Sequence, residues 1–420
     1  MIKIKDNYDL VVIGGGSAGM AGAIEARKLG IKDILIIDKN DYLGGILNQC
    51  VHNGFGLTEF KEELTGPEFM TRLSDEVKKL NIDYVLNTTV VNLMPNKTVW
   101  ASNNEGFYII KAKAFLLTTG CYERNAGAIM LPGERPSGVV TAGTAQLYLN
   151  VYGYLVGKRV FILGSGDIGL IMARRLTLEG ARVLGVAELC PYSNGLNRNM
   201  VQCLQDFNIP LYLSHTVSDV KGRDGKLEGI TISKVNPDGS ISHDEDKYYD
   251  VDTLLLSVGL IPNSPLLRDC GGKLTRTKGA IINDHYMTSV DGVFSAGNVL
   301  HVHDLVDLVT KEARLVAGFI KNYIDGKEIK NETYTDVIAS DGIGYVLPHK
   351  IGKHSTNDVT FKFRVRRPIK DCVVRFFNDK ELIKEIKKPV LIPSEMTEIN
   401  LTNEELKKFN KNITVKVENK

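Results

Sequence analysis

The sequence predicts an α/β fold made of two βαβ units, followed by a small β domain. Two observations predict the βαβ units: the pattern Gly-x-Gly-x-x-Gly occurs twice, and each copy stands between a buried strand and a helix. A third observation concerns the region after residue 332, where apolar and polar side chains alternate in short stretches.

The composition is that of an ordinary folded protein. At roughly 100–200 residues per domain, the 420 residues allow two to four domains. Because 43% of the residues are hydrophobic and 24% are charged, a disordered or fibrous chain is excluded. The net charge of +2 gives no overall field that would attract nucleic acid or an anionic membrane, so neither is expected as a partner.

No segment has the pattern of an export signal or a membrane span. The N-terminus leads directly into an apolar strand, and no apolar run approaches the roughly 18–20 residues that cross a bilayer. The six cysteines are scattered without a Cys-x-x-Cys pair, so we expect neither a disulfide scaffold nor a bound metal. A cytoplasmic location is therefore predicted.

The first glycine pattern follows the buried strand Leu10–Ile13. Gly14 suits a tight turn, Gly16 a close approach of the backbone to a pyrophosphate, and Gly19 the packing of helix on strand. Asp38 ends the next strand, where a carboxylate can accept hydrogen bonds from a ribose. The alternative, a βαβ unit whose glycines serve only packing, lacks a reason for this acid.

The second pattern repeats the first. A strand, Arg159–Leu163, precedes Gly164, Gly166 and Gly169, and the strand after the helix ends in Glu188. An acidic residue at this place binds the 2′-hydroxyl of NAD and repels the 2′-phosphate of NADP. Because no arginine follows Glu188 before Arg198, we expect NADH rather than NADPH.

Three further motifs make the chain similar to a known superfamily. They are Leu-Gly-Gly at 43–45, Leu-Leu-Thr-Thr-Gly at 116–120 and Thr-Ser-Val-Asp-Gly-Val-Phe-Ser-Ala-Gly-Asn at 288–298. Residues 8 to about 325 resemble the pyridine nucleotide-disulfide oxidoreductases, flavoproteins with two dinucleotide-binding domains. In that superfamily the last motif ends in Gly-Asp and the Asp binds the ribityl chain of FAD. Here Asn298 replaces it, and an amide can still donate and accept hydrogen bonds.

The resemblance implies FAD at the first pattern and NAD(H) at the second. The implied FAD contacts beyond the glycines and acid already named are Ser17, Ala18, Lys39, Gly44, Gly45, Val90, Thr119, Gly120, Gly297, Asn298 and Asp304. The implied NAD contacts beyond those already named are Asp167, Ile168 and Gly259.

The order of the motifs predicts that the NAD domain is inserted into the FAD domain, since the segment ending at Asn298 follows the second glycine pattern. The FAD-binding domain is expected over 1–130 and 260–328, and the NAD-binding domain over 131–259. Both crossings are placed where Gly and Pro interrupt apolar strands. In such a geometry a nicotinamide can lie over an isoalloxazine.

A redox-active pair of cysteines is missing from both places where this superfamily carries one. Cys50 stands alone after the Gly-Gly loop, and Cys190 and Cys203 are too far apart for a Cys-x-x-Cys motif. The segments 44–56, 63–69, 118–125, 131–146 and 297–307 look like a narrower group. These are the FAD-dependent oxidoreductases found beside bacterial glycerol-3-phosphate dehydrogenase, related to subunits of sarcosine, opine and hydrogen-cyanide-forming dehydrogenases.

Two side chains are candidates for chemistry. His301 and His303 alternate with apolar residues, so one is expected to face the flavin and the other the surface. His303 is favoured as the flavin-side group, with a capping or surface role as its alternative. Asp304 is expected to cap the helix 305–324, whose N-terminus would point at the flavin.

Cys50 is the second candidate, as a redox-active or flavin-contacting thiol near His52. The alternative is a cysteine that only packs. Cys121 is expected near the cofactor in a packing role.

The C-terminal region, 332–420, predicts a small antiparallel β domain. In the stretch 359–370, Phe361, Phe363 and Val365 share one face and Lys362, Arg364 and Arg366 share the other. The basic face is interpreted as solvated, with docking of a partner or an acidic carrier as the alternative.

Taken as a whole, the sequence predicts an FAD-dependent NADH oxidoreductase. Electrons pass between NAD(H), FAD and a protein or small-molecule acceptor, with a glycerol-3-phosphate dehydrogenase as one candidate partner. An NADH oxidase that uses oxygen and a non-catalytic nucleotide-binding scaffold subunit are the alternatives.

Overall fold

The computed structural model describes residues 4–327, 332–340 and 342–419. The chain forms two compact units: unit 1 comprises Met1–Cys121 and Pro262–Lys420, and unit 2 comprises Tyr122–Ile261. One nucleotide-binding domain is thus inserted into the other, as predicted. Unit 2 includes Ala126 and Ile129, which pack against its hydrophobic core and precede the expected start of the NAD-binding domain at residue 131.

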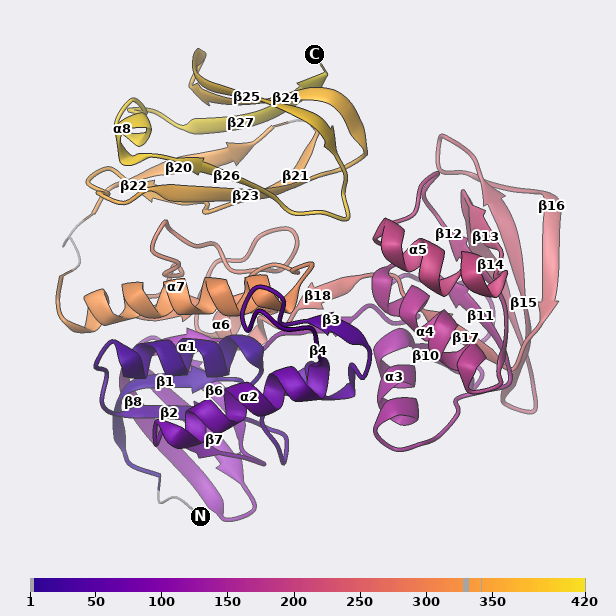
Figure 1. Cartoon of the computed structure of the whole chain (residues 1–420), viewed down its shortest axis with the longest axis horizontal. Helices are drawn as coiled ribbons and strands as arrows, with labels where there is room; N and C mark the ends of the chain where they lie inside the picture. The colour runs from indigo at the N-terminus through magenta and orange to yellow at the C-terminus, as the bar shows by residue number, and fades with distance from the viewer. Residues whose placement is uncertain (1–3, 328–331, 341, 420) are drawn as a thin grey trace. The chain divides into compact units, whose positions relative to one another are not determined.

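A mixed sheet, with both parallel and antiparallel strand pairs, forms the centre of the FAD-domain part of unit 1 (Figure 1). Its strand order is β5-β2-β1-β8-β7-β6, with β19 also pairing with β8. The C-terminal half of β8 lies parallel to β1 and β19, and its N-terminal half lies antiparallel to β7. The strands are β1 (Asn7–Ile13), β2 (Ile34–Ile37), β5 (Asp83–Val85), β6 (Thr89–Met94), β7 (Thr98–Asn103), β8 (Gly106–Leu117) and β19 (Val293–Ser295).

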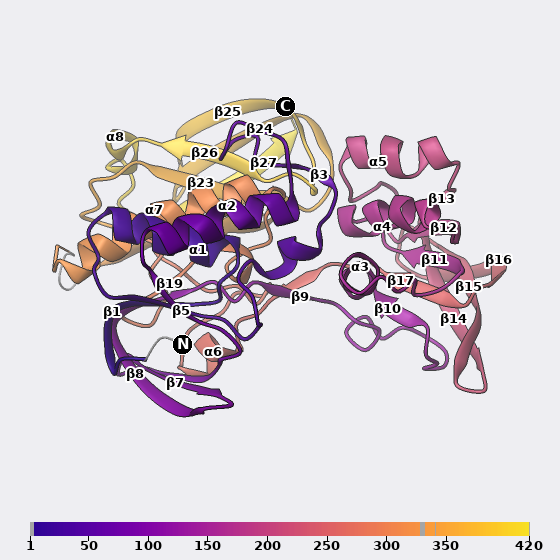
Figure 2. The same cartoon turned by 60° about the horizontal axis from the view of Figure 1, so that its bottom comes forward.

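Helices α1 (Ser17–Lys28) and α7 (Val306–Ile324) pack side by side, although they are far apart in the sequence (Figure 2). Gly22 on α1 permits close packing of this helix on the sheet, because a Cβ there would lie 2.6 Å from the Leu116 side chain on β8. The other elements of this part are α2 (Gly66–Lys79), α6 (Pro265–Asp269), η1 (Gly45–Gln49), η3 (Gly297–Val299), β3 (Asn53–Phe55) and β4 (Leu64–Thr65).

Unit 2 contains a second parallel sheet, of order β10-β17-β11-β12-β13, and an antiparallel sheet, β14-β15-β16. Its parallel strands are β10 (Val139–Thr141), β11 (Arg159–Leu163), β12 (Arg182–Glu188), β13 (Leu211–Leu213) and β17 (Thr253–Leu256). Its remaining elements are α3 (Ala142–Asn150), α4 (Asp167–Leu178), α5 (Asn197–Cys203), η2 (Gln205–Phe207), β14 (His215–Arg223), β15 (Lys226–Val235) and β16 (Ile241–Asp250). The chain passes between the units in β9 (Cys121–Glu123) and β18 (Leu260–Pro262).

The C-terminal part of unit 1 is a β domain with its own hydrophobic core, which includes Phe361, Phe363 and Phe376. Its two sheets have the orders β22-β20-β27-β24-β25 and β21-β23-β26. The pairing is antiparallel as expected, except between β20 and β27, which are parallel. The elements are β20 (Tyr334–Ala339), β21 (Ile343–Leu347), β22 (Lys350–Gly352), β23 (Val359–Val365), β24 (Ile369–Asn378), β25 (Glu381–Leu391), β26 (Thr397–Leu401), α8 (Asn403–Leu406) and β27 (Ile413–Asn419).

The interpretation of the basic face as solvated is wrong for Lys362 and Arg364, whereas Arg366, which follows β23, is exposed as expected. Lys362 is 7% exposed, and its ammonium contacts Glu312 on α7. Arg364 pairs with Asp304 and donates to the carbonyl oxygen of Val302 at 3.0 Å. The side chains of β23 do alternate: Phe361, Phe363 and Val365 pack in the β-domain core, whereas Lys362 and Arg364 contact residues of the FAD domain.

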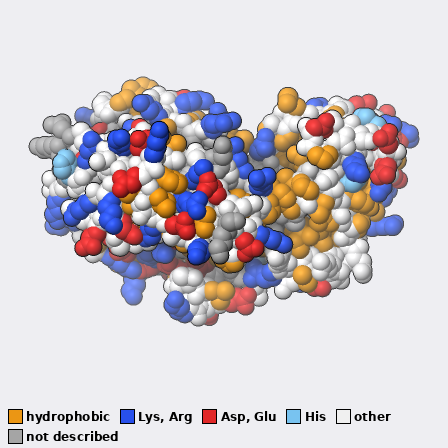
Figure 3. Space-filling model, turned by 90° about the horizontal axis from the view of Figure 1, so that it is seen from above, with side chains coloured by type: hydrophobic (Ala, Val, Ile, Leu, Met, Phe, Trp, Pro, Cys, Tyr) orange, Lys and Arg blue, Asp and Glu red, His pale blue; other side chains and the backbone are white. Residues whose placement is uncertain are grey.

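Charges are mixed over the surface. Figure 3 shows Lys and Arg side chains interspersed with Asp and Glu on the face that it presents. This distribution agrees with the small net charge and offers no broad basic area to a polyanion on that face. Among the residues that the structure describes, no helix is long and apolar enough to cross a membrane.

Candidate functional site

The first glycine loop lies between β1 and α1 and has the conformation that its sequence requires. Gly14 adopts φ +105°, and a Cβ there would lie 2.5 Å from the carbonyl oxygen of Thr118. A Cβ at Gly19 would collide with the carbonyl oxygen of Gly14. Gly16, by contrast, has nothing within 4 Å of where its Cβ would be. The loop is closely packed on its protein side and open at Gly16, as a backbone that approaches a pyrophosphate must be.

Gly16 is also the N-cap of α1, and no side chain caps this helix end. The implied contacts Ser17 and Ala18 begin the helix, so their backbone N–H groups have no partner within the helix. The first turn contains no acidic residue that would repel a phosphate. The N-terminus of α1 therefore fits the anionic pyrophosphate of a dinucleotide.

The Leu-Gly-Gly motif lies directly against this loop. Gly44 donates to the carbonyl oxygen of Gly15 at 2.9 Å, and a Cβ on Gly45 would be 3.5 Å from the Cα of Gly16. Both glycines adopt positive φ, +119° and +59°. The structure thus brings together two motifs that the sequence placed on the same cofactor.

The acid at the end of the second strand has a task that the sequence analysis missed. Asp38, 6% exposed, accepts the N–H of Gly15 at 2.7 Å and that of Asn40 at 2.8 Å. It therefore holds the glycine loop in place, whatever it binds in addition. Lys39 follows it, and the N–H of Thr88 donates to the Asp38 carbonyl oxygen at 3.0 Å, which brings the chain near Val90 to the same end of the sheet.

The second glycine loop, between β11 and α4, repeats this geometry. Gly164 adopts φ +96° and packs against Ser257, and a Cβ on Gly169 would lie 2.5 Å from the Cβ of Ser257. Glu188, 4% exposed, accepts from the backbone N–H of Ser165 at 2.9 Å and from its hydroxyl at 2.6 Å. Gly166 is the N-cap of α4, again without a side-chain cap.

Asp167 and Ile168 open α4, as the implied contacts require. The carboxylate of Asp167 accepts from the backbone N–H of Leu196 at 2.9 Å and from the Asn199 amide at 2.6 Å. It thereby ties the segment before α5 to the second loop. Gly259 adopts φ +101° shortly after β17.

The segment from Gly297 to His303 follows β19 in unit 1. Gly297 adopts φ +76°, and a Cβ there would lie 2.8 Å from the Ala18 side chain at the start of α1, so this segment lies next to the first loop. Asn298 accepts the backbone N–H of His303 at 3.1 Å, and its amide nitrogen contacts the Cys121 sulfur at 3.7 Å. Thr119 and Gly120 immediately precede Cys121 in the sequence. The Thr119 hydroxyl donates to the carbonyl oxygen of Asn263, and the backbone N–H of Asn263 donates to the carbonyl oxygen of Gly120.

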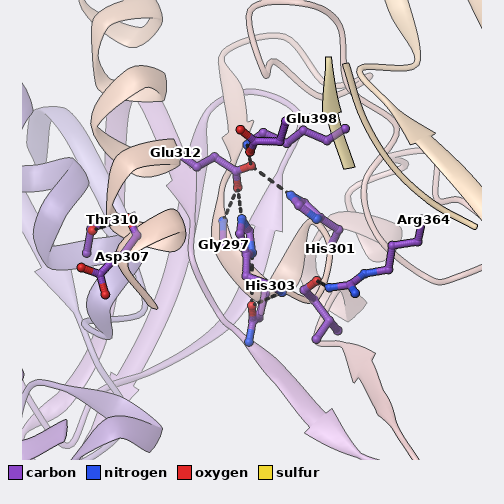
Figure 4. Close-up of polar contacts among 11 residues, drawn as sticks. Gly297, His301, His303, Asp307, Thr310, Glu312, Arg364 and Glu398 are labelled. Carbon is purple, nitrogen blue, oxygen red and sulfur yellow. Dashed lines mark hydrogen bonds and ion pairs between the residues drawn. The ribbon is translucent and has the colours of Figure 1, made fainter. Parts of the chain in front are cut away.

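The expectation that one histidine faces the surface is wrong. The side chains of His301 and His303 are each 3% exposed, and their ring centroids are 4.0 Å apart. Residues 301–303 are not in a strand, so alternate positions do not point to opposite sides. Both rings face Glu312 on α7: His301 Nε2 is 3.0 Å from Oε2, and His303 Nε2 is 3.4 Å from Oε1 (Figure 4).

The expectation that Asp304 caps the helix is also wrong. The N-cap of α7 is Leu305, and it has no side-chain capping bond. The carboxylate of Asp304 instead pairs with Arg364 and accepts the N–H of Met396 at 2.7 Å. Its role as a cofactor contact remains a prediction.

Cys50 lies at the end of η1, where its sulfur contacts the carbonyl oxygen of Ile46 at 3.5 Å. Its carbonyl oxygen accepts the N–H of Gly66 at the start of α2. The His52 ring lies 4.9 Å from the Phe55 ring. These contacts are compatible with a packing role, and the redox role remains a prediction.

Sequence analysis missed two acids on α7. Glu312, 2% exposed, organises the histidines, and Asp307, 5% exposed, accepts the backbone N–H groups of Gly56, Thr58 and Glu59 at 3.1, 2.9 and 2.8 Å. A signal was present for Glu312, because it shares the buried face of α7 with Val309, Ala313 and Val316. A charge on the apolar stripe of a helix needs a buried partner.

His301, His303 and Glu312 offer ligand atoms within 4.8 Å of one another, which is a possible arrangement for a metal. However, the ammonium of Lys362 lies 2.8 Å from Glu312 Oε2. A cation bound to this carboxylate would therefore meet a fixed positive charge. The cluster is better described as an ion pair with two imidazoles.

Two Rossmann-like domains, each with a glycine loop at an uncapped helix N-terminus and a buried acid, define a protein that binds two dinucleotides. The match to a family model identifies the family of such proteins. The model described as "Pyridine nucleotide-disulphide oxidoreductase" matches residues 8–314, and the chain belongs to that family.

The chain is also similar to curated relatives and shares its fold with solved structures. The hydrogen cyanide synthase subunit HcnB of Pseudomonas aeruginosa is 26% identical over 338 residues, which are 75% of this chain and 70% of the relative. An alkyl hydroperoxide reductase of the same organism is 27% identical over 72% of this chain, but the match spans only 55% of that relative. Thioredoxin reductase of T. acidophilum shares the fold with a TM-score of 0.63 and 24% identity, covering 77% of this chain and 100% of the other.

The NAD-dependent persulfide reductase of A. fulgidus shares the fold as well, with a TM-score of 0.59 and 18% identity over 88% of this chain and 67% of the other. FAD and a nicotinamide dinucleotide are the cofactors of this family and of this chain. The open backbone at Gly16 and the uncapped end of α1 fit the first of these cofactors.

Proposed function

We propose that the protein takes electrons from NADH onto FAD and passes them to an acceptor outside the chain, without a redox-active disulfide of its own. When bound, FAD accepts the electrons that NADH delivers as a hydride, a transfer that needs neither an acid nor a base from the protein. The chain's residues then have to bind and orient the two cofactors, with FAD at the Gly14–Gly19 loop and NADH at the Gly164–Gly169 loop.

The single observation that carries this proposal is the repetition of one site geometry in the two units. Asp38 accepts the backbone N–H of Gly15, and Glu188 accepts that of Ser165. Each donor stands between the first two glycines of its loop, and each loop leads into a helix without a side-chain cap. Glu188 also supports the preference for NADH, because a carboxylate there repels a 2′-phosphate.

An acceptor outside the chain is supported by the cysteines. All six lie within the described residues, and no disulfide joins any two of them. Cys190 precedes α5 and Cys203 is its last residue. Cys203 is buried, and burial raises its pKa to about 11. Such a thiol is a poor nucleophile at neutral pH.

The proposal also concerns the protein that exchanges electrons with the flavin. The motifs resemble the oxidoreductases that accompany glycerol-3-phosphate dehydrogenase, and the relative HcnB is named as a subunit of a synthase. A glycerol-3-phosphate dehydrogenase is therefore the first partner to test. The flux can run in either direction, since the same relay in reverse reduces NAD.

The test is an anaerobic titration of the purified protein with NADH and, separately, with NADPH, while the flavin absorbance near about 450 nm is followed. We expect NADH to bleach the flavin and NADPH to do so poorly. Air is then admitted: slow recovery of the absorbance supports an acceptor other than oxygen, whereas fast recovery identifies an NADH oxidase. A protein that binds no flavin, or whose flavin responds to neither nucleotide, would refute the proposal in favour of a scaffold subunit.

A further inference from the structure

The C-terminal β domain inserts a positive charge beside the segment that carries the implied flavin contacts. Lys362 on β23 reaches Glu312 on α7, with its ammonium 2.8 Å from Oε2. The two residues are 7% and 2% exposed. A pair so far removed from water is retained only if both charges are compensated and hydrogen-bonded.

The Glu312 carboxylate connects this lysine to the segment from Gly297 to His303. Its Oε1 accepts the backbone N–H of Gly297 at 2.9 Å and lies near His303, while its Oε2 faces His301 (Figure 4). The Lys362 ammonium contacts the same Oε2. One side chain thus fixes a glycine at positive φ and two imidazoles. His303 in turn contacts Asn298, the residue expected on the ribityl chain.

The charges around Glu312 come from several elements. Glu398 on β26 lies 4.0 Å from the Lys362 ammonium, and this ammonium is 5.8 Å from the centre of the Tyr286 ring. The ring centroids of Tyr345 on β21 and His301 are 6.2 Å apart, and Arg364 pairs with Asp304. Among these groups, Lys362 is the cation in direct contact with Glu312.

The protonation states follow from burial and from this contact. Burial lowers the pKa of His301 to about 3, so its ring is neutral at pH 7. Burial alone would also lower the pKa of Lys362, but the Glu312 carboxylate raises it above its ordinary value. Burial would favour a protonated Glu312, yet Lys362 and the two histidines hold its pKa well below the usual range. At neutral pH the cluster therefore contains one ammonium, one carboxylate and an uncharged His301.

We propose that Lys362 is a positioning residue of the flavin site: it compensates the charge of Glu312, so that the neighbouring His301 is not drawn into the charged form and the Gly297–His303 segment keeps its geometry. The inference rests on the proposed function, because that function places the flavin at this segment. It gives the β domain a task in the redox chemistry that the glycine patterns do not reveal.

The substitution Lys362→Met tests the proposal. It keeps an unbranched side chain, removes the charge and leaves Glu312 buried beside two imidazoles. The carboxylate is then expected to draw a proton onto His301, raising the pKa of that ring from about 3 into the range of about 6–8. The proton is bound below the new pKa and is lost as the pH rises through it.

Two readouts are needed on the full-length protein. Histidine NMR with ¹³C at Cε1 follows the protonation directly and does not require turnover. The midpoint potential and absorbance of the bound flavin, measured over the same pH range, show whether the flavin senses the change. Lys362→Arg should behave as the wild type, and the double variant Glu312→Gln, Lys362→Met should lose the new titration, because it removes both charges.

A new histidine titration in the Met variant, absent in the Arg and double variants and accompanied by a pH-dependent shift of the flavin potential, is the expected result. A Met variant whose histidines titrate as in the wild type would overturn the proposal, and so would a new titration that leaves the flavin unchanged. If the Met variant does not fold but the double variant does, the result still supports charge compensation. If neither variant folds, Lys362 has a packing role and the proposal is overturned. Lack of flavin reduction by NADH would instead refute the proposed function, since the NMR readout does not depend on it.

Discussion

The two glycine loops differ less in their own geometry than in what surrounds them. Each has a glycine at positive φ, an uncapped helix and a buried acid that accepts the N–H of the loop's middle residue. The second loop is supported within unit 2 by Ser257 and by the segment before α5. Around the first loop, unit 1 gathers segments that are far apart in the sequence, including Gly297, α7 and, through Lys362, strand β23.

This comparison teaches that one motif can be embedded in two ways. A change near the second loop should remain local to nucleotide binding in unit 2. A change near the first loop should also be felt in the stability of unit 1, because buried charges and histidines depend on the same contacts.

Acid should destabilise unit 1 selectively. Burial lowers the pKa of His301 to about 3 and that of His349 to about 4, whereas the histidines of unit 2, His215 and His243, are not buried. Between these pKa values and the ordinary histidine pKa of 6.5, the unfolded chain binds more protons than the folded chain. The free energy of unfolding therefore falls as the pH drops below 6.5. At pH 5 the loss is about 2 kcal/mol for each buried histidine.

Urea unfolding followed by the fluorescence of Trp100, the single tryptophan and a residue of unit 1, measures this loss at pH 7 and pH 5. The variant His349→Gln should reduce the difference by about 2 kcal/mol. The matched control His243→Gln, at an exposed histidine of unit 2, should leave it unchanged. Equal acid sensitivity of the two variants would contradict the burial argument.

A methyl group on the third glycine should be tolerated less in the first loop than in the second. In Gly19→Ala the new Cβ collides with the backbone carbonyl of Gly14, so stability should fall by about 3 kcal/mol and flavin content with it. In Gly169→Ala the Cβ meets the Ser257 side chain, and a loss of about 1–2 kcal/mol with retained flavin is expected.

Thermal unfolding and the ratio of flavin to protein after purification distinguish these outcomes. Gly16→Ala is the control, because its Cβ has open space. It should leave the stability of the flavin-free protein within about 0.5 kcal/mol and still weaken FAD binding. Unaltered FAD affinity in this variant would show that the pyrophosphate does not approach Gly16.

Replacing either of the two acids should weaken the binding of one cofactor and leave the binding of the other unchanged. Asp38→Ala leaves the N–H of Gly15 without its acceptor and should lower flavin content, while NADH binding is retained. Glu188→Ala should do the reverse. Each substitution removes acceptors from buried donors, at a cost of about 1–3 kcal/mol, or roughly tenfold to a hundredfold in affinity for the cofactor concerned. Calorimetric titration with FAD and with NADH measures both, and equal losses of both cofactors in one variant would argue against separate sites.

The smallest effect is expected at Cys50. Hydride transfer needs no thiol, and the sulfur contacts a backbone carbonyl. Cys50→Ser should therefore change the rate of flavin reduction by NADH by less than about twofold. Stopped-flow absorbance checks this, with Cys190→Ser in unit 2 as the comparison. A loss of tenfold or more would establish Cys50 as a redox-active or flavin-contacting thiol.

Several features of the site were beyond the reach of the sequence patterns. The alternation of His301 and His303 was interpreted with strand geometry, but residues 301–303 lie outside any strand, and both rings point at Glu312. Asp304 has the residue type of a helix cap, yet Arg364 competes for its carboxylate from 60 residues away in the sequence. Contacts of this kind depend on which strand covers which helix, and local patterns carry no record of it.

The sequence by itself determined the two nucleotide-binding folds, the insertion of one domain into the other and the family. These follow from short-range rules: a glycine where a Cβ cannot fit, an acid one βαβ unit later, and apolar periodicity. Only the tertiary structure decided that Lys362 and Arg364 are ion-paired to the FAD domain, and that Lys362, Glu312 and the two histidines form one cluster. The physical reason is that a charge becomes buried or solvated according to what packs over it, and that neighbour lies far away along the chain.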